Sequence, residues 1–96
     1  MNDVIVYTKD YCGWSMRAKH LLESKGVAFT EIDVTHDPAR EAEMNARSGR
    51  FTVPQVFIDG THIGGYDDLA AADASGELDR ILAHGRAAAP RTRRAA

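Results

Sequence analysis

The sequence predicts a single α/β domain built on a four-stranded mixed sheet with helices on its faces. In the first third of the chain, strand-like apolar runs flank a stretch of helical spacing, and a βαβ unit of this kind joins two parallel strands by a right-handed crossover. Later in the chain, two strand-like runs flank Asp59-Gly60, a strong signal for an antiparallel hairpin. With further helical stretches, the expected order is β-α-β-α-β-β-α.

The first strand is expected over residues 4–7, a β-branched run typical of a strand buried on both faces. Helical spacing follows from Trp14 to Lys25, and Gly26 stands where a C-terminal cap glycine is expected. A second strand is expected over residues 27–34. The side chains predicted to face the core from these segments are Met16, Ala18, Leu21, Leu22, Phe29 and Ile32.

The second helix is expected to begin at Asp37-Pro38, an N-cap residue followed by proline at the first helical position. It would run to about residue 47 and close at Gly49. The two hairpin strands are expected over residues 53–58 and 61–63. A last helical stretch is expected to open at Asp67-Asp68, break at residues 75–76 and resume through residue 82.

Length and charge limit the classes of function. The 96 residues suffice for one domain, placed at residues 1–85, followed by a basic and disordered tail over residues 86–96. The tail holds four of the twelve basic residues, so the body has 8 basic against 14 acidic residues, or −6, and nucleic-acid binding is not expected. No apolar run reaches the length of a membrane span, about 20 residues. We therefore expect a soluble protein without membrane contact. A single unpaired cysteine argues against a disulfide-stapled secreted fold, so the expected compartment is the reducing cytoplasm. The chain is also expected to be a monomer.

The only cysteine, Cys12, lies between the first strand and the first helix, in Cys12-Gly13-Trp14-Ser15. A second cysteine at position 15 would make a dithiol motif, but Ser15 stands there. No disulfide can form within the chain, so redox chemistry must pair Cys12 with a sulfur from another molecule.

The surroundings of Cys12 favour the thiolate, which is the nucleophilic form. The first turn of a helix offers unpaired N–H groups and the positive end of the helix dipole. Lys9 adds positive charge three residues earlier, and the Ser15 hydroxyl can donate a hydrogen bond to the sulfur. The alternative is a buried, inert cysteine.

Three segments, residues 7–15, 52–58 and 64–68, resemble the signature segments of glutaredoxins in order and spacing. The resemblance covers about residues 3–84. It implies a thioredoxin-like fold, a cis peptide bond at Val53-Pro54 facing the cysteine, and glutathione as co-substrate. The resemblance thus agrees with the element order derived above.

The same resemblance implies a catalytic pair, Cys12 and Ser15, beside a glutathione site. The cysteinyl part of glutathione would pair with the Val53 backbone, its γ-glutamyl end would meet the last helix and Asp68, and Asp67 would cap that helix. The glutathione-binding residues are expected to be Lys9, Trp14, Thr52, Val53, Pro54, Gly65, Asp67 and Asp68. Lys9 would meet the glycine carboxylate, with Arg40 as a second partner. Tyr7 and Trp14 are either apolar walls near the sulfur or ordinary packing residues. The four histidines lack metal-ligand spacing, so no resident metal is expected.

The tetrapeptide and its surroundings resemble different glutaredoxin classes. Cys-Gly-Trp-Ser resembles the monothiol class, whereas the short spacing from Lys9 to Cys12 and the segment 51–54 have the dithiol form. Ser15 is therefore either native or a replacement of a resolving cysteine, and both explanations stay open.

Three functions follow from these observations. The first is a glutathione-dependent thiol–disulfide oxidoreductase that reduces glutathione mixed disulfides by a monothiol mechanism and so serves cell redox homeostasis. Its partners would be glutathione and glutathionylated or disulfide-containing proteins. The alternative is a [2Fe-2S] carrier, in which two protomers each supply Cys12 and two glutathione thiolates complete the ligands. The third is a redox-inactive interaction domain.

Overall fold

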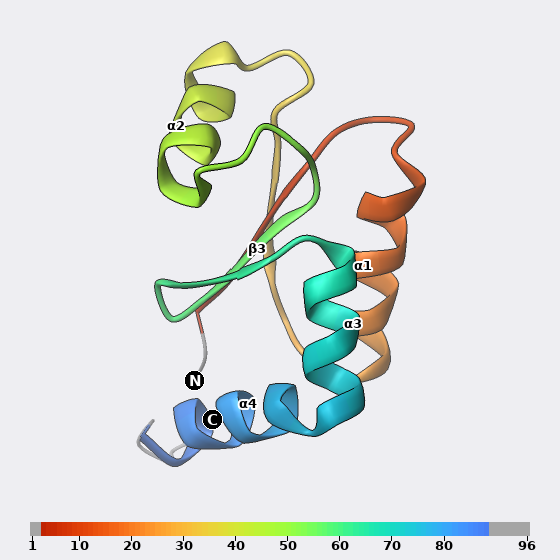
Figure 1. Cartoon of the computed structure of the whole chain (residues 1–96), viewed down its shortest axis with the longest axis vertical. Coiled ribbons are helices and arrows are strands. Elements are labelled where there is room, and N and C mark those ends of the chain that lie inside the picture. Colours follow the sequence, from red (N-terminus) through yellow and green to blue (C-terminus); the bar gives the residue numbers. More distant parts are fainter. Residues whose placement is uncertain (1–2, 89–96) are drawn as a thin grey trace.

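The computed structural model describes residues 3–88, which form a four-stranded sheet with helices on both faces (Figure 1). The sheet order is β2-β1-β3-β4, with β1 parallel to β2 and antiparallel to β3, and with β3 antiparallel to β4. The elements are β1 (Val4–Thr8), α1 (Gly13–Ser24), β2 (Thr30–Asp33), α2 (Pro38–Ser48), β3 (Gln55–Ile58), β4 (Thr61–Gly64), α3 (Tyr66–Ser75) and α4 (Glu77–Ala88). The predicted mixed sheet is confirmed, and its arrangement is thioredoxin-like.

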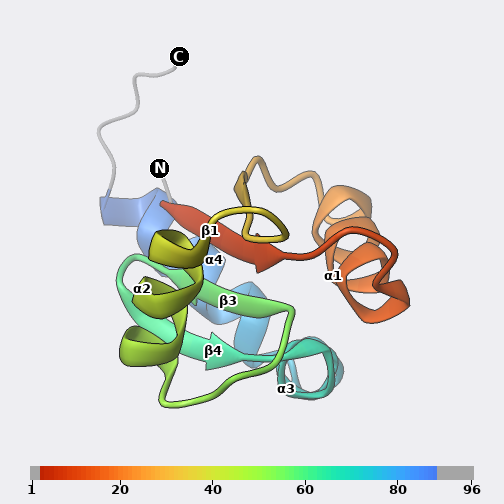
Figure 2. The same cartoon turned by 90° about the horizontal axis from the view of Figure 1, so that it is seen from above.

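The sheet separates two hydrophobic cores, because successive side chains of β1 and β3 point to opposite faces. Helices α1 and α3 cover one face and α2 covers the other (Figure 2). The larger core lies under α1, α3 and α4, and its buried members are Val4, Val6, Ala18, Leu22, Val56, Ile58, Leu69, Ala72, Leu78 and Leu82. The smaller core lies under α2 and consists of Tyr7, Val34, Met44 and Phe57.

The ends of the helices follow the predicted caps. The Asp37 side chain accepts a hydrogen bond from the Arg40 backbone N–H at 3.1 Å at the start of α2. Gly26 and Gly49 follow α1 and α2 with φ of 69° each, in the left-handed region that favours glycine. The hairpin turn is also as predicted, since Asp59 (φ 52°) and Gly60 (φ 83°) both have the positive φ of a type I′ turn.

One prediction for α1 is wrong. Met16 is 47% exposed, whereas Ser15 is buried. The helix begins at Gly13, and its buried stripe passes through Ser15, Ala18 and Leu22, at the spacing of i, i+3 and i+7. Met16 lies one residue outside that stripe.

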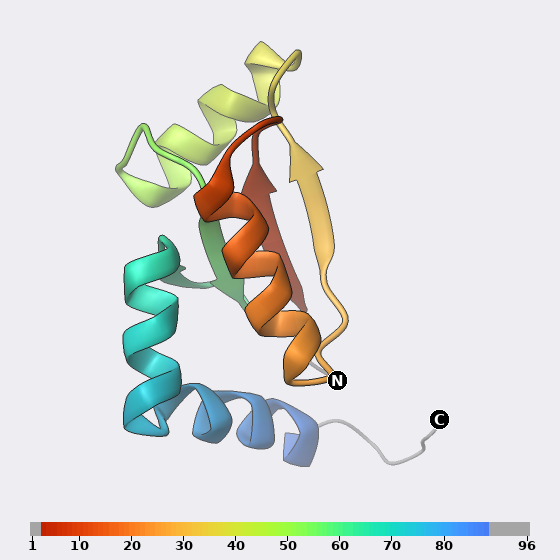
Figure 3. The ribbon, with the colours of Figure 1, turned by 90° about the vertical axis from the view of Figure 1, so that its right-hand side faces the viewer.

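The break predicted at residues 75–76 separates two helices. Gly76 has a φ of 84° and ends α3, and α4 leaves in a new direction across the end of the sheet (Figure 3). Helix α4 continues to Ala88, three residues into the segment expected to be disordered. Residues 89–96 lie outside the described range, so the disordered tail stays a prediction. The helices within residues 3–88 are all too short or too polar to cross a bilayer.

Candidate active site

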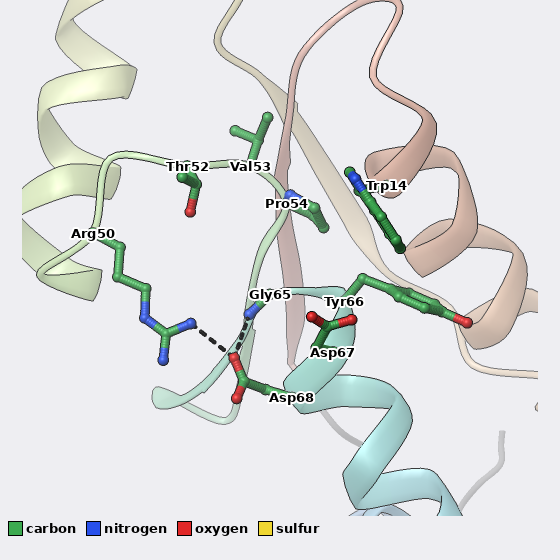
Figure 4. A pocket seen from close by; sticks show the side chains of 9 residues that line it. All are labelled: Trp14, Arg50, Thr52, Val53, Pro54, Gly65, Tyr66, Asp67 and Asp68. Carbon is green, nitrogen blue, oxygen red and sulfur yellow. Dashed lines mark hydrogen bonds and ion pairs between the residues drawn. The ribbon is translucent and has the colours of Figure 1, made fainter.

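Three loops that are distant in sequence meet around one open cavity (Figure 4). They are the loop from β1 into α1, the loop before β3 and the turn from β4 into α3. The Val53–Pro54 peptide bond in the second loop is cis, as the resemblance implied. The cavity has a volume of about 220 Å³ and is lined by Trp14, Arg50, Thr52, Val53, Pro54, Gly65, Tyr66, Asp67 and Asp68.

Cys12 lies directly before α1, at its N-cap position. The side chain is partly exposed, and the Sγ donates a long hydrogen bond of 3.9 Å to the carbonyl oxygen of Val53. Since Val53 lines the cavity, this contact places the sulfur next to it. Cys12 therefore contacts the loop that contains the cis Val53–Pro54 bond.

The environment of Cys12 lowers the thiol pKa from its usual value of 9.0, although burial alone would raise it. The lowering comes from hydrogen bonds to the sulfur by the Ser15 hydroxyl and by the backbone N–H groups of Ser15 and Trp14, with a smaller contribution from the charge of Lys9. These are the hydroxyl, helix N-terminus and lysine effects predicted from the sequence. The predicted direction of the pKa shift is confirmed.

Ser15 is 2% exposed, and apart from the Cys12 sulfur its hydroxyl has no hydrogen-bond partner among the described side chains. It lies close enough to Cys12 for its dipole to lower the pKa of the thiol. A buried hydroxyl without another partner is free to turn toward a thiolate. A dithiol motif would have its second cysteine at position 15, and in this chain that position holds a serine whose hydroxyl stabilises the Cys12 thiolate.

Lys9 does not line the cavity. Its Nζ makes an ion pair of 2.7 Å with Glu41 on α2, with both side chains partly exposed. Its charge still acts on Cys12, as described above. For Lys9 to bind a ligand carboxylate, the carboxylate would have to compete with Glu41.

Asp68, rather than Asp67, caps α3. The N-cap residue is Gly65, so Asp68 stands three positions into the helix and its carboxylate accepts a hydrogen bond of 3.0 Å from the Gly65 backbone N–H. Asp67 is exposed and lines the cavity without capping the helix. The predicted cap at Asp67 is therefore wrong, because the helix starts one residue earlier than its first aspartate.

Arg50 is an unpredicted member of the site. Its Nη1 lies 2.7 Å from Asp68 Oδ2. This pairing is the largest cause that lowers the pKa of Asp68 from its usual value of 3.8, and the hydrogen bond from the Gly65 N–H is the next. The only signal in the sequence is a basic residue two positions before Thr52, and nothing local distinguishes it from an ordinary surface arginine. Its charge complements Asp68 only because the fold brings the second and third loops together.

An aromatic pair forms the other wall of the cavity. Trp14 is 52% exposed, and its ring lies 5.7 Å from that of Tyr66, centroid to centroid. The Arg17 guanidinium lies over the Trp14 ring, 4.9 Å from the ring centroid. Tyr66 was not predicted, because its role depends on its place beside α1 and not on any local pattern.

Two predicted residues lie away from the cavity. Tyr7 is fully buried beneath α2, and its hydroxyl donates to Glu43 and accepts from Arg47. Arg40 pairs with Glu43 on the exposed side of α2. Of the two alternatives for Tyr7, the structure shows the packing residue, because β1 turns alternate side chains to the α2 face. Arg40 does not line the cavity.

The comparisons with known proteins agree with this geometry. The family model described as Glutaredoxin matches residues 4–63. Glutaredoxin 3 of Escherichia coli (strain K12) is 55% identical over 82 residues, covering 85% of this chain and 99% of that protein. A glutaredoxin of Pseudomonas aeruginosa is 45% identical over 82 residues, covering 85% of this chain and 98% of that protein.

Solved structures are similar as well. A buckwheat glutaredoxin–glutathione complex has a TM-score of 0.79 and 34% identity, covering 86% of this chain and 78% of that one. The solution structure of glutaredoxin from Brucella melitensis has a TM-score of 0.75 and 51% identity, covering 83% of this chain and 87% of that one. Sequence and fold agree over nearly the whole described domain, and the chain therefore belongs to the glutaredoxin family.

Proposed function

We propose that this chain reduces glutathione mixed disulfides by a monothiol mechanism, with Cys12 as the only protein sulfur. Membership of the glutaredoxin family supports the broader role of a glutathione-dependent thiol oxidoreductase. The observation that carries the finer proposal is the position of Cys12, whose lowered-pKa sulfur lies against the Val53 carbonyl at the edge of the cavity.

The cavity suits the chemistry of glutathione, a tripeptide with one thiol, two carboxylates and one ammonium group. The Val53 backbone would pair with the extended cysteinyl part in the manner of strand addition, with its carbonyl oxygen released from the long hydrogen bond of the Cys12 thiol. The α3 N-terminus would receive the γ-glutamyl carboxylate, and Asp68 would receive the ammonium group. The buckwheat glutaredoxin–glutathione complex, at 34% identity, supports glutathione as the ligand.

Binding of the ammonium group requires an exchange of partners at Asp68. In the free protein Asp68 is paired with Arg50 at 2.7 Å, and the ion pair is partly exposed, so it is weak. A ligand ammonium would displace Arg50, whose freed guanidinium would then lie beside the γ-glutamyl carboxylate. Lys9 would take the glycine carboxylate in exchange for Glu41, whereas Arg40 is not retained as a ligand.

The reaction needs two exchange steps and one protein sulfur. The Cys12 thiolate attacks the glutathione sulfur of a protein–glutathione disulfide, the old S–S bond breaks, and the protein thiolate leaves. The thiolate of a second glutathione then attacks the glutathione sulfur bound to Cys12. Oxidised glutathione leaves, and the Cys12 thiolate is regenerated, so atoms and electrons balance without a second cysteine. The aromatic wall of Trp14 and Tyr66 would shield the exchanging sulfurs from water.

Intact mass followed by turnover tests this proposal. Incubation with oxidised glutathione should add one glutathionyl group to the wild type and none to Cys12→Ser. The wild type should then reduce a glutathionylated peptide with glutathione as the only reductant. Absence of the adduct, or an adduct without turnover, would contradict the monothiol mechanism.

Ser15→Cys tests whether position 15 can hold a resolving cysteine. The buried Ser15 side chain lies beside Cys12, so a cysteine there should confer the reduction of protein disulfides. Wild type should reduce such disulfides poorly, because no second protein thiol can resolve the intermediate. Equal activity of the two forms on a protein disulfide would contradict that reasoning.

The [2Fe-2S] alternative stays a prediction. Among the side chains that the structure describes, residues 3–83, no three His, Cys, Asp or Glu residues group in a way that could hold a metal ion. One chain offers a single thiolate, so any cluster needs three sulfurs from outside it. Anaerobic reconstitution with iron, sulfide and glutathione, followed by size-exclusion chromatography, distinguishes a coloured dimer from a colourless monomer.

A further inference from the structure

A buried polar chain connects strand β4 to the loop that lines the cavity. Gln55, the first residue of β3, is fully buried, and its side-chain Nε2 donates to the carbonyl oxygen of Thr52 at 3.0 Å and to the Thr52 Oγ1 at 3.2 Å. The other end of the amide, Oε1, lies 2.7 Å from Nε2 of His62 on β4. Three residues from separate segments thus form one continuous line of hydrogen bonds.

The direction of every bond in this line follows from donor and acceptor chemistry. A backbone carbonyl only accepts, so the amide nitrogen of Gln55 must face Thr52 and its oxygen must face His62. An amide oxygen also only accepts, so His62 must carry a proton on Nε2. Protonation of the ring at low pH adds its proton at Nδ1 and leaves this bond in place.

The His62 ring is itself held in place. It is partly buried and stacks on Phe57, the residue that faces it across the hairpin, with 4.9 Å between ring centroids. Burial lowers the pKa of the imidazole, and the neighbouring charge of Arg50 lowers it further. A neutral ring with a fixed position is a rigid donor for the amide of Gln55.

Thr52, in contrast, belongs to an exposed loop without strand hydrogen bonds. Its neighbour Val53 is the residue whose carbonyl oxygen accepts from the Cys12 thiol. We propose that Gln55 and His62 are positioning residues, which act through Thr52 to hold the Val53 backbone in the orientation that binds the substrate tripeptide. This inference rests on the function proposed above and deepens it.

The two residues should control binding and not the ionisation of the nucleophile. The groups that lower the pKa of Cys12 belong to Ser15, Trp14 and Lys9, whereas Gln55 and His62 hydrogen-bond to Thr52 and to each other. Loss of the relay would free the Thr52 loop to sample other orientations. The substrate would then have to order the loop on binding, which costs affinity.

Steady-state kinetics of three variants test the inference. Gln55→Met keeps the side-chain volume and removes all three hydrogen bonds of the amide, and His62→Phe keeps the ring contact with Phe57 and removes the donor. Each should raise KM for a glutathionylated peptide, by about tenfold for Gln55→Met, while kcat stays within about twofold; tenfold corresponds to about 1.4 kcal/mol. The double variant should raise KM no further than Gln55→Met alone, since the two residues act in series.

Controls separate positioning from general damage. His20→Phe makes the same change, histidine to phenylalanine, at an exposed position on α1 and should leave KM unchanged. The pH dependence of Cys12 alkylation by iodoacetamide should be the same in all variants, and urea unfolding shows that each is folded at the assay temperature.

The outcomes distinguish the relay from the proposed function. An inactive wild type would overturn the monothiol mechanism and the relay with it. If the wild type is active, any of three results would overturn the relay alone. They are an unchanged KM in Gln55→Met, additive effects on KM in the double variant, and a shifted pH profile of Cys12 alkylation in the variants.

Discussion

Gly64 is the position where a single methyl group should do most damage to the site. It has a φ of 124°, in a region that residues with a side chain rarely adopt. A Cβ there would lie 2.2 Å from Oδ2 of Asp68 and 2.8 Å from its Cβ. Rotation of the carboxylate relieves the first clash but not the second, and it also breaks the bonds from Arg50 and Gly65.

The expected cost of Gly64→Ala adds three parts. The backbone strain is worth about 1–3 kcal/mol, the overpacking about 1–3 kcal/mol, and the lost hydrogen bonds of a half-exposed carboxylate about 1 kcal/mol. We expect a loss of about 3–7 kcal/mol in the free energy of unfolding, a large fraction of the total stability of a domain of this size. The melting temperature should fall by more than about 12 °C.

Gly65→Ala is the matched control, one residue away. Its φ is −83°, and a Cβ would meet only the Pro54 carbonyl oxygen at 3.5 Å, an ordinary contact. This variant should lose less than about 1 kcal/mol. Urea unfolding monitored by far-UV circular dichroism measures the loss of stability in both variants. Similar small losses in the two variants would refute the reasoning, because they would show that neither the φ nor the contact with Asp68 constrains position 64.

Further predictions concern the nucleophile, the core and a helix cap. Ser15→Ala should raise the pKa of Cys12, because the hydroxyl stabilises the thiolate; the alkylation profile should move to higher pH, and an unmoved profile would contradict this role. Tyr7→Phe should cost about 1–2 kcal/mol in urea unfolding, through its lost hydrogen bonds, yet leave KM unchanged, and a raised KM would return Tyr7 to the site. Asp37→Ala should cost about 1 kcal/mol, because the first turn of α2 loses its cap, and no loss would show that the Asp37 side-chain bond is not stabilising.

Local patterns were sufficient to predict most of the fold. The cap at Asp37, the glycines after α1 and α2 and the turn at Asp59-Gly60 depend on backbone preferences of neighbouring residues, which the sequence displays directly. The mistake at Met16 came from the helix register. A shift of one residue changes which side chains face the core, and only the packing against the sheet decides that register.

The site divides in the same way. The sequence by itself determined that one sulfur, Cys12, lies at a helix N-terminus with Ser15 and Lys9 near enough to lower its pKa, because all three are close along the chain. Only the tertiary structure decided which distant groups meet that sulfur. The Val53 carbonyl, the pairing of Arg50 with Asp68, and the relay from His62 through Gln55 to Thr52 depend on contacts between separate loops and strands. Tyr7 lies in the core for the same reason, since the alternation of β1 turns it toward α2.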